Sequence, residues 1–171
     1  MSRIAKADAL GILSEGHREV DALVGRLSPA DAVAAGLGGG TWSPKDLLGH
    51  LTSWEEYALA AVGAWADGVT APIDQALRAK GLTAVNREAV EMRSERPLAR
   101  VRAEFDDVHR ELIRVLGALA DETWDAPPTR RARRPLGEKV GAILGGPGGW
   151  YRHAAAHLPD LRAFVAERSA R

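Results

Sequence analysis

Apolar residues recur along most of this chain at alternating steps of three and four residues, which is the spacing of one face of an α-helix. The pattern predicts four principal helices, over residues 2–27, from Ser43 onwards, over residues 98–119 and over residues 149–168. In the third of these, His109 flanks the apolar row, so we expect it to be partly exposed and structurally neutral. No segment alternates apolar and polar residues as a half-buried strand would. The pattern therefore predicts an all-α protein.

The second helix has the clearest start. Ser43 is a suitable N-cap, Pro44 suits the first helical position, and Asp46 stands where a capping-box carboxylate bonds the Ser43 amide. His50 lies beside the apolar stripe of this helix. Because Asp46 lies one turn before His50, its alternative role is to orient the imidazole. The stripe itself consists of Leu47, Leu51, Trp54, Ala58, Ala61 and Trp65.

Two less regular segments separate the long helices. The first is a crossover that begins near Pro72, includes Gly81, and ends in a short helix over residues 83–93 with Asn86 on or near its inner face. The second is rich in loops and holds one helical turn over residues 136–144. The architecture expected from these elements is a four-helix bundle with a long crossover and one or two short extra helices.

Length and composition narrow the class of protein. The chain has 171 residues, enough for one domain with a real core, so we expect a single domain over residues 1–171. Basic and acidic residues balance at 23 each, and no recognition motif is found, so nucleic acid and anionic membranes are not expected partners. We find neither a signal-peptide core nor an apolar run of membrane-spanning length, so a soluble cytoplasmic protein is the expectation.

The absence of cysteine restricts the chemistry of any site. Disulfides and thiolate ligands are excluded, so a metal ion would be held by histidine or carboxylate. A sulfur nucleophile would have to come from a cosubstrate.

Two of the five histidines, His153 and His157, stand four residues apart. On a helix this spacing places both imidazoles on one face, where they can reach a single metal ion, as in the two-histidine helical motif of zinc proteases. Sites in helical bundles are built from inward-facing side chains of different helices, and His50 fits that scheme. His17 also falls on an apolar seam. It either reaches the same site or lies at the edge of the core beside a polar neighbour.

Aromatic residues stand next to the candidate ligands in the sequence. They are Trp42, Trp54, Trp150 and Tyr151. Each either forms part of the apolar wall of a pocket or is an ordinary core residue.

A basic run in the second irregular segment has two interpretations. It consists of Arg130, Arg131, Arg133 and Arg134. Such a run is commonly a solvated surface loop. If it is functional, it would attract a small anionic ligand beside the site.

The motif Trp-Ser-Pro-x-Asp-Leu-Leu-x-His-Leu-x-x-Trp-Glu, which starts at Trp42, combined with His153-x-x-x-His157, resembles the DinB-like superfamily. This group of four-helix bundles includes YfiT-type proteins and the N-terminal domain of mycothiol-dependent maleylpyruvate isomerase. The stretch from Val85-Asn86 through Arg96-Pro97-Leu98 to the end of the third long helix is similar to the ClbS/DfsB branch. The resemblance covers nearly the whole chain.

The resemblance implies a divalent metal, commonly zinc, nickel or iron, held by His50, His153 and His157. In the isomerase branch the first ligand of the last helix is a carboxylate, and here it is a histidine, so the chain follows the three-histidine variant. We also expect no counterpart of that enzyme's second domain, and the isomerase reaction itself is not transferred. A homodimer is the family-level expectation.

Three functions are compatible with an open three-histidine site, which leaves positions for water, a thiol or a substrate. The first is a metal-dependent enzyme that acts on a small electrophile, such as a thiol S-transferase in detoxification that uses a low-molecular-weight thiol. The second is a ClbS/DfsB-like resistance protein that hydrolyses or sequesters a reactive natural product. The third is a non-catalytic metal-binding module for dimerisation.

Overall fold

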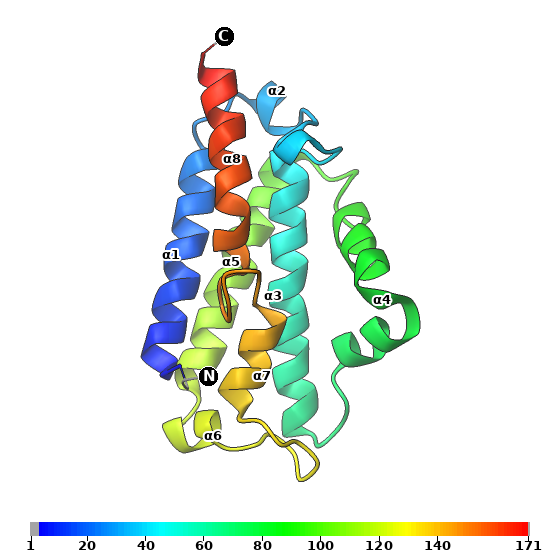
Figure 1. Ribbon diagram of the computed structural model, residues 1–171, viewed down its shortest axis with the longest axis vertical. Helices are drawn as coiled ribbons and strands as arrows, with labels where there is room; N and C mark the ends of the chain where they lie inside the picture. The colour runs from blue at the N-terminus through cyan, green and yellow to red at the C-terminus, as the bar shows by residue number, and fades with distance from the viewer. Residues whose placement is uncertain (1–3, 171) are drawn as a thin grey trace.

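The computed structural model describes residues 4–170, which fold into helices and contain no β-strand (Figure 1). Four long helices run side by side, and the predicted all-α bundle with a long crossover is confirmed. None of the described helices combines the length and the apolarity that crossing a membrane requires. The elements are α1 Lys6–Val24, α2 Pro29–Ala32, the 3-10 turn η1 Leu37–Gly39, α3 Pro44–Ala66, α4 Pro72–Glu91, α5 Leu98–Ala118, α6 Asp121–Asp125, α7 Leu136–Ile143 and α8 His153–Ser169.

Helix α3 is the centre of the bundle and packs against α4, α5, α7 and α8. Every residue from 47 to 55 is buried, which is the pattern of a helix covered on all sides. Its start follows the local rules that the sequence indicates. Ser43 Oγ accepts from the Asp46 amide at 3.2 Å, and Asp46 Oδ2 accepts from the Ser43 amide at 2.9 Å. The predicted capping box is confirmed.

The crossover is more helical than we expected. Helix α4 already begins at Pro72, so the prediction of a helix confined to residues 83–93 is wrong for the residues before it. Gly81 explains the difference, since its φ of 74° and ψ of 168° interrupt α4 with a conformation that glycine adopts easily. The second half of α4 still places Asn86 on the side facing α3, where it bonds Trp54.

Two consecutive helices, α7 and α8, occupy the fourth position of the bundle (Figure 1). The last helix begins at His153, and the predicted start at Gly149 is therefore wrong. The chain turns between the two helices, with positive φ values at Gly149 and Tyr151. The His153 amide then donates to the Leu144 carbonyl at 3.1 Å, which connects the start of α8 to the end of α7. The first helix is likewise shorter than predicted, although residues 2 and 3 lie outside the described chain.

The buried row of α5 differs from the predicted one. It contains His109, which is only 7% exposed, so the expectation of a partly exposed, neutral histidine is wrong. His109 Nδ1 lies 2.9 Å from Glu55 Oε1 of α3, and this buried pairing is what makes a histidine acceptable in the α3–α5 interface. Val108, which the predicted row contains, is only half-buried.

Arg93, just after α4, connects three helices. Its buried guanidinium bonds Ser53 Oγ at 2.8 Å and Glu56 at 2.6 Å on α3, and Glu104 at 2.9 Å on α5. Glu104 also accepts from Arg100, whose side chain is 69% exposed. Glu104 therefore takes part in one ion pair with a buried arginine, Arg93, and in another with an exposed arginine, Arg100.

We expect Arg93→Ala to lower the free energy of unfolding by about 3 kcal/mol, because it leaves buried polar groups unpaired. The matched control Arg100→Ala removes an exposed ion pair with the same acceptor and should cost less than about 1 kcal/mol. Urea unfolding followed by circular dichroism measures both. Equal losses in the two variants would contradict the role of burial.

Candidate metal centre

Three histidines from two helices converge in the bundle. His50 comes from α3, and His153 and His157 come from the first two turns of α8. One ring nitrogen of each lies within 4.8 Å of the others, and His50 Nε2 lies 3.0 Å from His153 Nε2. His50 is buried and the other two are half-buried. The structure therefore brings together the three residues that the sequence identifies as candidate ligands.

Small residues allow α8 to come close enough for this arrangement. A Cβ on Gly16 of α1 would lie 3.0 Å from the Ala154 Cβ, and a Cβ on Gly146 would lie 3.0 Å from the Ala156 Cβ. Both distances are shorter than ordinary contacts, so larger side chains would push α8 away. The position of the two α8 histidines thus depends on glycine and alanine at these contacts.

Two tryptophans flank His50. The Trp42 ring lies 4.9 Å from the His50 ring, and the Trp54 ring lies 6.3 Å from His50 and 5.6 Å from His153. Trp54 Nε1 donates to Asn86 Oδ1 at 3.1 Å, so Asn86 orients this indole from α4. Trp42 and Trp54 therefore lie against the imidazoles, Trp54 also lines a pocket, and a pocket role for Trp42 and Asn86 stays a prediction.

Burial keeps the cluster neutral. Desolvation, together with the neighbouring histidines, lowers the pKa of His50 from 6.5 to about 2 and that of His153 to about 3. The pKa of His157 is also lowered by burial, with Asp160 opposing the shift. Neutral imidazoles offer lone pairs to a metal ion without first losing a proton. The donor set of three neutral nitrogens therefore fits zinc, nickel or ferrous iron.

Asp46 does not orient His50. Its Oδ2 accepts from both the amide and the hydroxyl of Ser43, so the capping box occupies it. His50 Nδ1 is buried and has no hydrogen-bond partner among the described residues. The capping box at the start of α3 is therefore sufficient to explain a carboxylate at position 46.

Trp150 and Tyr151 pack against the segment that contains α6 and α7. Trp150 packs over Gly141, where a Cβ would come within 2.9 Å of the Trp150 Cβ. The Tyr151 ring stacks on Trp124 at 5.9 Å, and its hydroxyl donates to the Gly137 carbonyl. Both residues therefore connect the start of α8 to α7, and Tyr151 is a buried core residue whereas Trp150 is half-buried.

His17 has the polar neighbour that the second interpretation requires. Its ring lies between Phe105 at 4.1 Å and His109 at 4.0 Å, and its Nε2 lies 3.1 Å from Asp106. Burial and the neighbouring His109 lower its pKa from 6.5 to about 4, and Asp106 opposes the shift. Sequence reasoning missed the Glu55–His109 pair behind this ring, although a glutamate directly after Trp54 inside an apolar helix was a signal for it.

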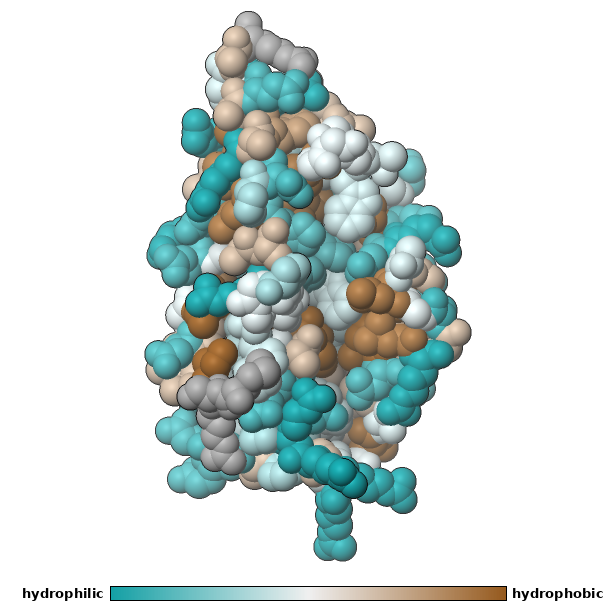
Figure 2. Space-filling view, viewed as in Figure 1, coloured by the Kyte–Doolittle hydropathy of each residue, from teal (hydrophilic) through white to brown (hydrophobic). Residues whose placement is uncertain are grey.

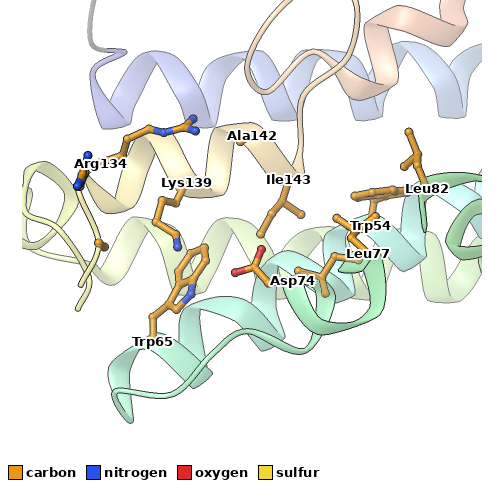
Figure 3. A pocket seen from close by; sticks show the side chains of 12 residues that line it. Trp54, Trp65, Asp74, Leu77, Leu82, Arg134, Lys139, Ala142 and Ile143 are labelled. Atoms are coloured by element: carbon orange, nitrogen blue, oxygen red, sulfur yellow. The ribbon is translucent and has the colours of Figure 1, made fainter. Parts of the chain in front are cut away.

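A pocket of about 560 Å³ opens beside the cluster, with Trp54 as the wall that the two share (Figure 3). Its volume lies in the range of small-molecule sites. Residues of α3, α4, α7 and the arginine loop, which we define as residues 129–134, surround it. The structure thus places this loop at the pocket.

The fold and the site together define an all-α bundle with a three-histidine cluster between its central helix and its last one. A family model described as the DinB superfamily matches residues 12–159, and the chain belongs to this superfamily. The crystal structure of an uncharacterised protein from Escherichia coli UTI89 has the same fold, with a TM-score of 0.81, 15% identity, and coverage of 96% of this chain and 95% of that one. Curated proteins gave no match.

The lowered pKa values predict how stability depends on pH without metal. In the unfolded chain His17, His50 and His153 titrate near 6.5, whereas in the folded state they stay neutral to about pH 4 or lower. Below about pH 6.5 the unfolded state therefore binds more protons, and the free energy of unfolding should fall as pH falls, by at most about 1.4 kcal/mol per pH unit for each histidine.

Urea unfolding in EDTA at pH 7 and pH 5 tests this expectation. The variant His17→Gln, which removes one titrating group outside the cluster, should show a smaller loss between the two pH values. Equal stability of the wild type at both pH values would contradict the neutral, desolvated state of these rings.

Proposed function

We propose that this protein is a metal-dependent enzyme that acts on small electrophilic molecules, with His50, His153 and His157 as the protein ligands of one divalent ion. The observation that carries the proposal is the cluster itself: three uncharged nitrogen donors within 4.8 Å of one another, beside a pocket. Three protein ligands leave coordination positions for exchangeable groups, which is typical of catalytic sites. Zinc, nickel and ferrous iron all suit the donor set.

A bound divalent ion would supply Lewis acidity and would lower the pKa of a water or thiol that binds it. The residues around the proposed ligands shape the environment of the metal site. Trp42 and Trp54 cover the imidazoles and limit the access of water, and Asn86 holds the Trp54 indole in place. Since the chain contains no cysteine, we propose a low-molecular-weight thiol as cosubstrate and S-transfer as the reaction.

A second candidate is a resistance protein that hydrolyses or sequesters a reactive natural product. The size of the pocket favours it, because about 560 Å³ accommodates a ligand larger than a simple electrophile. The dependence of turnover on an added thiol distinguishes the two candidates.

Metal content tests the ligand set. Untagged protein should contain about one first-row divalent metal per chain by elemental analysis, and His50→Ala and His157→Ala should each lose it while circular dichroism shows the fold intact. The matched control is His17→Asn, which replaces a half-buried histidine outside the cluster and should retain the metal. A wild type that binds no metal even after reconstitution would refute the site.

Activity tests the reaction class. Metal-loaded protein should accelerate the reaction of monochlorobimane with an added thiol, which displaces chloride, above the uncatalysed rate, and His157→Ala should lower this acceleration at least about tenfold. Turnover of an electrophile without thiol would identify the hydrolytic alternative. If chelation lowered only the melting temperature and no reaction were found, the metal would be structural.

A further inference from the structure

The pocket beside the cluster has two chemically different ends (Figure 3). Arg134 and Lys139 lie at one end, next to Trp65, whereas Trp54, Leu77 and Leu82 lie at the other. Trp54 is also the residue that contacts His50 and His153, so the apolar end is the one next to the metal-binding cluster. A ligand that fills the pocket must match this polarity.

The cationic end continues into a second pocket of about 730 Å³, which shares Trp65, Asp74, Ala132 and Lys139 with the first. We call the two together the groove. Its charged lining consists of six cations and one carboxylate, although the whole chain has zero net charge. Positive charge is therefore concentrated here. The cations are Arg78, Arg130, Arg131, Arg133, Arg134 and Lys139, and the carboxylate is Asp74.

The cations of the first pocket are available to a ligand. In the described part of the chain, Arg133 and Arg134 form no ion pair or hydrogen bond, and Lys139 Nζ lies 4.3 Å above the Trp65 ring in a cation–π contact. Figure 3 shows the Asp74 carboxylate between the two ends of the pocket. An anionic group would be repelled from the middle and attracted to the end formed by Lys139 and the arginines.

The hydropathy of the surface follows the same division. Apolar atoms gather over α4, and strongly hydrophilic atoms cover the foot of the molecule, where the arginine loop lies (Figures 1 and 2). The distance between the two ends of the pocket can be estimated from two tryptophans of α3 that line it. Trp54 and Trp65 are eleven residues apart on this helix, which corresponds to roughly 16 Å along its axis.

From this polarity and length we propose that the groove binds an elongated amphiphilic anion, with its carboxylate or phosphate group at Lys139 and Arg134 and its apolar end against Trp54. If the proposed function holds, the reacting bond lies in the apolar part of the ligand, next to the histidines. The anionic group then serves only as an anchor. This chemical consequence of the inference rests on the proposed function. Binding itself does not require the metal.

Binding of decanoate tests the two-ended site. Decanoate should bind more tightly than decan-1-ol, which lacks the charge, and more tightly than butyrate, which lacks the apolar chain, as measured by isothermal calorimetry. Equal affinity for decanoate and decan-1-ol would overturn the anionic end, and equal affinity for butyrate would overturn the apolar end. Decyl phosphate in place of decanoate shows which head group the cations prefer.

Variants test the anchor. The double variant Lys139→Gln/Arg134→Gln should weaken decanoate at least about tenfold and leave decan-1-ol unchanged. Asp74→Asn should strengthen decanoate, because it removes the opposing charge. The matched control is Arg110→Gln on α5, which removes an arginine that is 73% exposed and lies outside the groove. An equal loss in the control would overturn the assignment to the groove.

The orientation is tested with 10-bromodecanoate, whose bromine quenches the fluorescence of a tryptophan that it touches. Trp54→Phe should remove most of the quenching, and Trp65→Phe should leave most of it. The opposite result would place the anionic group next to the histidines and overturn the proposed orientation.

All titrations are made in EDTA and again with metal-loaded protein. Tight binding of decanoate by a protein that never takes up metal would support the groove while refuting the metal-dependent function. A protein that contains metal and binds no amphiphilic anion would refute the groove and leave the metal-dependent function standing. Failure of the groove and failure of the proposed function are therefore distinguishable.

Discussion

Burial of α3 on nearly every side is the constraint on which the rest of this structure depends. The packing of α4, α5, α7 and α8 around α3 removes water from residues 47–55, His50 included. The charged form of an imidazole is costly there, so His50 and, beside it, His153 remain neutral. The same packing that forms the core therefore prepares the nitrogen lone pairs that a metal ion needs.

The five histidines divide into two groups by their partners. His109 and His17 face carboxylates, Glu55 and Asp106; the Glu55–His109 pair is buried between α3 and α5, whereas the Asp106 side chain is 45% exposed. The remaining histidines bond no carboxylate of residues 4–170 and face one another instead. A carboxylate partner satisfies a buried imidazole, whereas a group of imidazoles without one has nitrogen donors available. This difference separates the candidate ligands from the structural histidines.

The proposed site also depends on contacts between small residues and on the crossover. Gly16 and Gly146 let α8 approach the rest of the bundle, and α4 supplies Asn86 to orient Trp54. Trp54 then contacts the histidines and also lines the groove. Its position gives one end of the groove an apolar character, while the arginine loop and Lys139 give the other a positive one. Helices far apart in the sequence thus together give the groove one apolar end and one positive end.

Local rules in the sequence determined much of this protein. The helical periodicity, the capping box at Ser43 and the four-residue spacing of His153 and His157 depend only on near neighbours, and each has its place in the structure. Tertiary structure alone decided the burial of His109, since its partner Glu55 lies 54 residues away, and the start of α8, since residues 145–152 turn against α7. It also decided the groove, because the spacing of the arginines says nothing about the apolar wall they face.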